Sequence, residues 1–375
     1  MPKDLKDEVS PALSPLPYIQ SIAAYQPGKP VTELAREMGL PVDSIVKLAS
    51  NENPLGMSPR AKEAAAAALA GGERYPDPFA LVAALAARHE VTMEEIVLGN
   101  GSNDVLDLIA RVFLDSGRSA VAAQYAFAVY PIATRSVGGE SIIVPARDFG
   151  HDLAAMEAAI RPDTRVIWIA NPNNPTGTFL AAEKLRAFLS RVPSRVAVVL
   201  DEAYNDYLEE KDRYDAVPWI REFPNLIVVR TFSKIYGMAG LRIGYGITSA
   251  PVAGLMNRVR QPFNCNNLAL AAAIAALDDV DFLRQSFECN RKGMTDIVDG
   301  LERLGLEFIP SYGNFITFKA GRDQESMVAV HQRLLRQGVI VRPLAGYQMP
   351  EWLRATIGTA DENARFLRAL KTALE

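Results

Sequence analysis

The chain has 375 residues, which exceeds the size of most single hydrophobic cores, so we expect two domains. With 40 Lys and Arg against 44 Asp and Glu, the formal net charge is −4, which excludes the broad basic field of a nucleic-acid-binding protein. Two Cys without a CxxC pair and three isolated His exclude a disulfide framework and the common zinc patterns.

The first 30 residues are rich in proline and show no hydrophobic period, so we predict an N-terminal arm over residues 1–30 that is extended. The opening stretch carries charges and prolines where a secretory peptide needs an apolar run. The longest apolar run, residues 268–277, is too short to span a bilayer. We therefore expect a cytoplasmic protein with no membrane contact.

Between residues 46 and 262 the chain alternates short apolar runs with longer helical patterns, which is typical of an α/β fold. Residues 61–69 and 81–88 are rich in Ala and Leu and predict helices. Residues 95–98 predict a strand, and the glycine-containing turn behind it leads into an amphipathic helix over 103–114.

Three apolar, β-rich runs follow at 166–170, 196–200 and 226–229, with a helical pattern at 181–189 between the first two. Their starts lie 30 residues apart, about the length of one βαβ unit. Unbroken apolar strands are typical of a parallel sheet that is covered on both faces. We therefore predict a large domain over residues 46–262 with a mostly parallel, doubly wound sheet.

After Pro262 the pattern changes to a long helical stretch over 268–304, short strands at 315–319 and 339–342, and a last helix over 362–374. We assign this part, residues 263–375, to a smaller α+β domain that residues 31–45 complete.

Polar side chains follow each of the three predicted parallel strands. The first strand leads into residues 171–177 (NPNNPTG), the second into Asp201 and Tyr204, and the third into Lys234 and, soon after, Arg242. In an open parallel sheet, ligands bind at the carboxyl ends of the strands. The sequence therefore predicts one site that contains an amide, a carboxylate, a phenol, an amine and a guanidinium.

These groups match the needs of pyridoxal phosphate (PLP), whose aldehyde forms a Schiff base with a lysine and whose ring nitrogen needs a carboxylate to keep its proton. Lys234 fits the first role and Asp201 the second, while Tyr204 and Asn174 can reach the ring oxygen. Taken singly, a lysine is usually a surface group, an Asp after a strand a helix N-cap, and NPNNPTG a turn. Their combination favours a cofactor site.

A phosphate site is predicted where a strand leads into a helix at Gly101, Ser102 and Asn103, because helix N-termini bind anions. Ser233 and Arg242 would join it. The segment is not a dinucleotide fingerprint, since Asp104 stands at the third glycine position. Phe127 and Tyr130 lie in an aromatic-containing loop that can cover a flat ring, although packing in the core is the competing interpretation.

Several motifs taken together resemble the aspartate-aminotransferase superfamily of fold-type I PLP-dependent transferases, and within it the histidinol-phosphate aminotransferase family of class II. The resemblance covers the chain from about residue 25 to its end. The motifs that carry it are SNENPLG (50–56), RYPDP (74–78), GNGSND (99–104), NPNNPTG (171–177), DEAY (201–204), TFSKIYGMAGLRIG (231–244) and LRATIGT (353–359).

The resemblance implies that Lys234 holds the cofactor and that Asp201, Tyr204 and Asn174 contact its ring. It also implies an obligate homodimer with shared active sites, in which Tyr75 of RYP reaches the cofactor phosphate of the other subunit. The reaction that it implies is a ping-pong transfer of an amino group between L-histidinol phosphate and 2-oxoglutarate, with glutamate as the other amine, in histidine biosynthesis.

Substrate residues are also carried over from the family motifs. The resemblance implies that Arg354 binds the anionic group of the substrate, that Arg342 and Tyr25 hold its phosphate, and that Asn53 contributes to the same site. Departures from the family pattern leave the substrate preference open. Phe127 stands where tyrosine is usual for ring stacking, and Ala355 replaces a β-branched residue after Arg354.

Three other functions are compatible with parts of this pattern. An aromatic amino-acid aminotransferase would use the same scaffold, and a PLP-dependent decarboxylase of a phosphorylated amino acid would share most of the site. A non-catalytic α/β nucleotide-binding module belongs to a different class, and it would require the polar residues at the strand ends to have gathered by accident.

Overall fold

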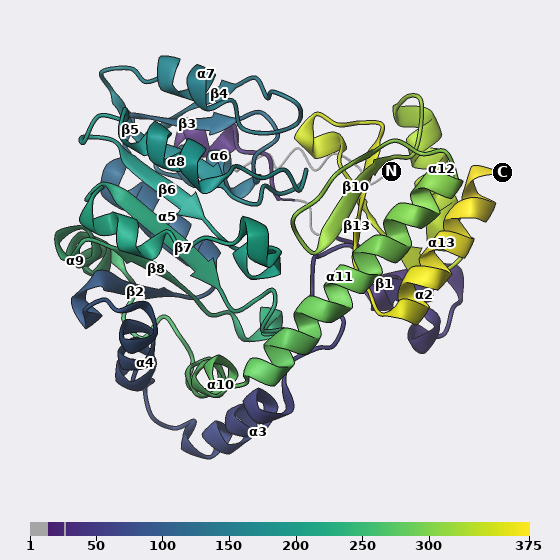
Figure 1. Ribbon diagram of the computed structural model, residues 1–375, viewed down its shortest axis with the longest axis horizontal. Coiled ribbons are helices and arrows are strands. Elements are labelled where there is room, and N and C mark those ends of the chain that lie inside the picture. Colours follow the sequence, from purple (N-terminus) through teal and green to yellow (C-terminus); the bar gives the residue numbers. More distant parts are fainter. Residues whose placement is uncertain (1–13, 26–27) are drawn as a thin grey trace.

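The computed structural model describes residues 14–25 and 28–375 (Figure 1). The helices are α1 (Pro17–Gln20), α2 (Val31–Met38), α3 (Pro59–Ala68), α4 (Phe79–His89), α5 (Ser102–Phe113), α6 (Val129–Ser136), α7 (Leu153–Ala158), α8 (Ala182–Leu189), α9 (Ala250–Val259), α10 (Asn267–Leu277), α11 (Val280–Arg303), α12 (Gln324–Arg336) and α13 (Ala360–Leu374). The strands are β1 (Val46–Lys47), β2 (Ile96–Gly99), β3 (Ser119–Ala123), β4 (Glu140–Val144), β5 (Thr164–Ala170), β6 (Ala197–Asp201), β7 (Leu226–Thr231), β8 (Gly244–Thr248), β9 (Phe308–Ile309), β10 (Phe315–Lys319), β11 (Val339–Ile340), β12 (Arg342–Pro343) and β13 (Trp352–Thr356).

A seven-stranded sheet forms the centre of the larger body, in the order β2-β8-β7-β6-β5-β3-β4. All neighbours pair in parallel except β8, which runs antiparallel to both β2 and β7. The strands are almost wholly buried because helices cover the sheet, except for the edge strand β4, of which only Val144 is buried. Helix α5, for example, packs on β2, β7 and β8. The predicted α/β fold with a mostly parallel sheet is confirmed, and the three predicted parallel strands are β5, β6 and β7.

The smaller body lies to the right in Figure 1 and contains two small sheets, one antiparallel in the order β12-β13-β10-β9 and one parallel pair, β1-β11. Helices α11, α12 and α13 pack beside these strands. A separate hydrophobic core fills this body, and it includes Ile297, Phe318, Leu334, Leu353 and Phe366.

Four details differ from the expectations. The helix expected over 268–304 is two helices, because Asp279 caps a new helix by accepting a hydrogen bond from the backbone N–H of Phe282. Helix α10 packs on α3 in the larger core, although the expected boundary at residue 262 assigned it to the smaller domain. Conversely, β1 pairs with β11 of the smaller body, although the larger domain was expected to start at residue 46. Within the arm, Pro17–Gln20 is helical instead of extended, and residues 1–13 lie outside the described part.

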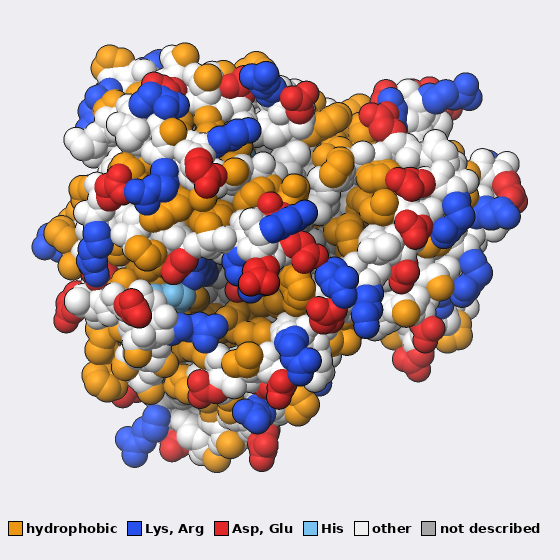
Figure 2. All heavy atoms as spheres, in the orientation of Figure 1, with side chains coloured by type: hydrophobic (Ala, Val, Ile, Leu, Met, Phe, Trp, Pro, Cys, Tyr) orange, Lys and Arg blue, Asp and Glu red, His pale blue; other side chains and the backbone are white. Residues whose placement is uncertain are grey.

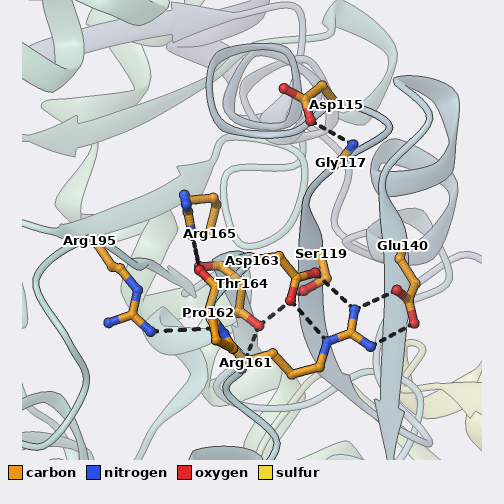
Figure 3. Close-up of polar contacts among 10 residues, drawn as sticks. All are labelled: Asp115, Gly117, Ser119, Glu140, Arg161, Pro162, Asp163, Thr164, Arg165 and Arg195. Carbon is orange, nitrogen blue, oxygen red and sulfur yellow. Dashed lines mark hydrogen bonds and ion pairs between the residues drawn. The ribbon is translucent and has the colours of Figure 1, made fainter.

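The free edge of the large sheet is held by a cluster of exposed ion pairs (Figure 3). Arg161, just before β5, donates to both carboxylate oxygens of Glu140 in the edge strand β4, at 3.0 and 2.5 Å. The same guanidinium donates to Asp163 at 3.2 and 2.9 Å. One arginine thereby connects the start of β4 to the start of β5, two strands that are separated by β3.

The face of the molecule seen in Figure 2 carries acidic and basic side chains that are interspersed, without a large area of one sign. Within the described ranges, no helix combines the length and the apolar character needed to cross a bilayer.

Candidate active site

A cavity of about 270 Å³ opens where the carboxyl ends of the parallel strands face the smaller body. The larger body contributes the residues that follow β5, β6 and β7, and the smaller body contributes Arg342 and Arg354 from β12 and β13. The predicted site residues that line the cavity are Tyr25, Ser102, Asn103, Phe127, Asn174, Asp201, Tyr204, Ser233, Lys234, Arg242, Arg342 and Arg354.

Lys234 follows the end of β7 and points into this cavity. Its ammonium group lies 3.4 Å from the carbonyl oxygen of Ser50 and 5.6 Å from the centre of the Tyr204 ring. Burial, followed by the nearby charge of Arg354, lowers the pKa of Lys234 to about 8. An amine with this pKa is partly neutral at physiological pH, and the neutral amine is the form that attacks a carbonyl carbon.

Asp201 is the last residue of β6 and is 4% exposed. One carboxylate oxygen accepts a hydrogen bond from the hydroxyl of Tyr130 at 2.9 Å, and the other accepts from the backbone N–H of Ala203 at 3.2 Å. Burial nevertheless raises the pKa of Asp201 to about 6. A cation in the cavity would stabilise the ionised form of this buried carboxylate, and a protonated ring nitrogen is such a cation.

Tyr204 lies three residues after Asp201 and is also buried. Its hydroxyl oxygen accepts a hydrogen bond from the side-chain amide of Asn51 at 3.0 Å, and its ring meets Phe315 edge-on at 5.1 Å. Burial raises the pKa of Tyr204 to about 12, so the phenol keeps its proton at neutral pH.

The start of α5 has the groups that an anion site requires. The backbone N–H groups of the first helical turn have no partner within the helix, and Ser102 and Asn103 line the cavity at that position. Arg242 donates to the Ser233 hydroxyl at 3.3 Å and lies against Gly101, where an added Cβ would collide with the guanidinium. Gly101 has a φ of 84°, so the turn also favours glycine for its backbone.

Two arginines form the opposite wall. Arg354 is 5% exposed; it donates to the side-chain oxygen of Asn174 and, at 3.0 Å, to the carbonyl oxygen of Ala49, while its Nε has no partner. The guanidinium of Arg342 lies 5.3 Å from the centre of the Tyr25 ring.

Four basic side chains therefore surround one cavity: Lys234, Arg242, Arg342 and Arg354. No Asp or Glu among the described residues forms an ion pair with any of them. Arg342 and Arg354 are buried, and Lys234 and Arg242 are half-buried. Cations removed from water without an ionic partner are unfavourable, so this wall is suited to a ligand with two or more anionic groups. Over the same described residues, no group of three His, Cys, Asp or Glu is placed to hold a metal ion.

Three predicted residues do not line the cavity of their own chain: Gly101, which lies behind it against the Arg242 guanidinium, Tyr75 and Asn53. Tyr75 is 80% exposed and stacks on Phe263, with ring centres 4.4 Å apart. Asn53, expected to bind substrate, is buried and donates to the carbonyl oxygen of Ile235 at 2.7 Å and to the Ser286 hydroxyl at 2.8 Å. Its amide supports the loop that follows Lys234.

The sequence interpretation missed two polar contacts. Asn51 stands inside the SNENPLG motif, but nothing in the sequence indicates that its amide reaches Tyr204. Tyr130 was noted only as a possible cover for a ring, whereas its hydroxyl donates to Asp201 and its ring stacks on Trp168. Its place three residues after Phe127, at the start of α6, was the one signal that pointed toward the cavity.

Comparisons with known proteins agree with this geometry. The family model described as "Aminotransferase class I and II" matches residues 43–370. The chain is 65% identical over 359 residues to histidinol-phosphate aminotransferase 1 of Dechloromonas aromatica, covering 96% of this chain and 98% of that protein. It is 57% identical over 360 residues to histidinol-phosphate aminotransferase 2 of Nitrosospira multiformis, covering 96% and 91%.

Among solved structures, the fold resembles that of histidinol-phosphate aminotransferase from Sinorhizobium meliloti in complex with pyridoxal-5'-phosphate. The TM-score is 0.86 at 28% sequence identity, and the match covers 96% of each chain.

Proposed function

The chain belongs to the class I and II aminotransferases, and on that premise we propose that it transfers an amino group between L-histidinol phosphate and 2-oxoglutarate with PLP as its cofactor. The observation that carries the proposal is the cavity wall with four basic side chains and no ion pair to a described residue. Both the cofactor and histidinol phosphate bear a phosphate, so such a wall suits their joint binding.

The donor set fits PLP group by group. Lys234 offers an amine of lowered pKa for the aldehyde, and Asp201 offers a buried carboxylate for the ring nitrogen. Tyr204 and Asn174 are assigned to the ring oxygen and Phe127 to the ring face. Gly101, Ser102, Asn103, Ser233 and Arg242 are assigned to the phosphate, since they combine helix N–H groups, hydroxyls and a guanidinium.

When bound, PLP supplies a carbonyl that reacts with amines and a ring that takes up electron density. Lys234 is then the general base, whose Nζ takes the proton from the substrate carbon that bears the amino group. Asp201 stabilises positive charge at the ring nitrogen by electrostatic attraction in a buried setting. Its carboxylate does so only while it is ionised, which the hydrogen bond from Tyr130 favours.

Arg354 and Arg342 bind the anionic ends of the two substrates in turn. A guanidinium accepts a carboxylate or a phosphate with two parallel hydrogen bonds, so one arginine serves both glutamate and histidinol phosphate. The buried, unpartnered Nε of Arg354 is a donor that such an anion would satisfy. Tyr25 packs on Arg342 and is 48% exposed, and we assign it to cover the bound phosphate end.

The active unit in this proposal is a homodimer. Tyr75 and its stacking partner Phe263 are exposed aromatic side chains on the larger body, and Leu69 and Phe79 are exposed near Tyr75 in sequence. Several large apolar side chains exposed to water close together are typical of an interface with another protein chain. A second copy would bury them and bring Tyr75 to the phosphate of the neighbouring site.

We place the reaction in the cytoplasm, as a step of histidine biosynthesis. The free cysteines Cys265 and Cys289 fit a reducing compartment.

Product analysis tests the proposal. Purified protein loaded with PLP is incubated with histidinol phosphate and 2-oxoglutarate, and glutamate is measured against time. Glutamate should form in equal amount to the substrate consumed, and only when both substrates are present. Release of carbon dioxide without any need for 2-oxoglutarate would instead identify a decarboxylase, and the proposal would be abandoned.

A further inference from the structure

Asn51 has an unusual place beside the cavity. It is buried, lines the cavity, and has a φ of 55°, in the left-handed region that Asn tolerates better than most residues. It follows the short strand β1, and its side chain points toward the phenol of Tyr204.

Hydrogen bonds to the smaller body hold Asn51 in this conformation. Its backbone N–H donates to the Thr356 hydroxyl at 2.9 Å, and that hydroxyl donates to the side-chain oxygen of Asn51 at 3.2 Å. Its carbonyl oxygen accepts from the side-chain amide of Asn314 at 3.0 Å. The remaining polar group, the side-chain N–H₂, donates to the hydroxyl oxygen of Tyr204 at 3.0 Å.

This arrangement decides what the phenol of Tyr204 can do. An amide N–H₂ group can only donate, so the Tyr204 oxygen accepts and its single proton must point elsewhere. No other described residue accepts a hydrogen bond from that hydroxyl, and the ring lines the cavity. We propose that Asn51 is a positioning residue that orients the Tyr204 hydroxyl as a hydrogen-bond donor toward the bound ligand.

The inference rests on the proposed function, in which the acceptor is the ring oxygen of PLP. A donor at that oxygen would stabilise negative charge on it, and so would favour the deprotonated form of the bound cofactor. Without Asn51, the Tyr204 proton is free to turn away from the ligand. The pH at which bound PLP changes its visible absorbance should then rise.

The test is a spectroscopic pH titration of PLP-loaded wild type and Asn51→Gly. Glycine keeps the left-handed backbone and both backbone hydrogen bonds, so only the side chain is removed. We expect the absorbance midpoint of Asn51→Gly to rise by about 0.5 to 1 pH unit, the equivalent of one ordinary hydrogen bond. Asn51→Asp, which has nearly the same shape but cannot donate, should shift in the same direction and serves if the glycine variant folds poorly.

A double mutant separates positioning from a general loosening of the loop. Tyr204→Phe should raise the midpoint at least as far, and Asn51→Gly should add nothing in the Tyr204→Phe background. A midpoint equal to that of wild type, or the same added shift in both backgrounds, would overturn the role of Asn51 alone. A wild-type protein that develops no visible absorbance with PLP would overturn the proposed function, and this inference with it.

Discussion

The two titratable groups at the centre of the cavity are Lys234 and Asp201, and burial moves their pKa values toward each other, to about 8 and about 6. Between these values the amine is still mostly protonated and the carboxylate mostly ionised. The opposite charges of the two groups then favour each other in the absence of a ligand. In the proposed function, Lys234 is the nucleophile and Asp201 the counter-ion for a cationic ring that bears an aldehyde.

The pKa of Lys234 predicts how covalent capture of PLP depends on pH. Since only the neutral amine attacks, the attachment rate should rise about tenfold per pH unit below pH 8 and level off above it. Stopped-flow absorbance of cofactor-free protein mixed with PLP measures this rate. Lys234→Ala should abolish attachment, whereas Lys184→Ala, at an exposed lysine of α8, should leave the profile unchanged. A rate that is independent of pH between 6 and 9 would contradict the assignment.

The hydrogen bond from Tyr130 to Asp201 gives a second prediction. It favours the ionised carboxylate and so holds the pKa of Asp201 lower than burial alone would set it. Because the ring nitrogen needs the ionised form, PLP affinity should weaken as pH falls through about 6 in the wild type. In Tyr130→Phe that loss should begin at higher pH. Equilibrium dialysis of PLP against pH measures it, and identical curves for the two proteins would show that the phenol has no effect on Asp201.

At this scale the sequence predicted most of the residues that line the cavity, because each follows a strand end or stands in a recognisable motif. It could not predict Asn51 beside Tyr204, since 153 positions separate them and only the packing of the two bodies joins them. Asn53 was assigned to substrate because it shares the same motif, although its amide is used by Ile235 and Ser286.

At the scale of secondary-structure elements, the start of α5 is the part most sensitive to a single substitution. Gly101→Ala would place a Cβ against the Arg242 guanidinium and strain a backbone with φ of 84°. We expect PLP affinity to fall about tenfold or more, because Arg242 would be displaced from the phosphate site. Isothermal titration measures the affinity. Gly254→Ala in α9, where a Cβ meets open space, is the matched control and should bind PLP normally.

The elements that the sequence identified are those with strong local patterns. Strands β5, β6 and β7 are rich in Val, Ile and Leu and were predicted within two residues of their ends. Strands β3 (SAVAA) and β8 (GYGIT) were missed because Ala and Gly carry little strand preference. The strands that pair with β3 and β8 determine their place in the sheet, and a local sequence pattern does not contain that information.

The ion-pair cluster around Arg161 belongs to the same scale. Arg161→Ala should cause a small fall in the midpoint of thermal unfolding, because its partners Glu140 and Asp163 are exposed and their ion pairs are weak. The difference from wild type should disappear at high salt, which screens exposed charges. A difference that persists in 1 M salt would show that the side chain contributes through packing instead.

At the scale of the whole molecule, the two bodies supply different parts of one site. Asp201, Tyr204 and Lys234 come from the end of the parallel sheet, and Arg342 and Arg354 come from the smaller antiparallel sheet. This division was foreseeable from the order of motifs along the chain. The assignment of α10 and β1 to particular bodies was not, because it depends on packing between segments that lie far apart in sequence.

The proposed dimer can be tested by mixing two inactive chains. One carries Tyr75→Ala and the other Lys234→Ala. In a mixed dimer, the cavity with an intact Lys234 would receive an intact Tyr75 from its neighbour, so transamination should reappear on mixing under conditions that exchange subunits. If Tyr75 acted on its own chain, or if the protein were a monomer in light scattering, mixing would restore nothing.

The central claim is that the basic wall of the cavity selects a phosphorylated amine. The most direct measurement compares kcat/KM for histidinol phosphate and for phenylalanine, each with 2-oxoglutarate as acceptor. Because Arg354 can bind the carboxylate of phenylalanine as well as a phosphate, the discriminating charge-assisted contact is that of Arg342, which predicts a preference of about tenfold or more for histidinol phosphate. Equal efficiencies, or a preference for phenylalanine, would contradict the claim and identify an aromatic amino-acid aminotransferase on the same scaffold.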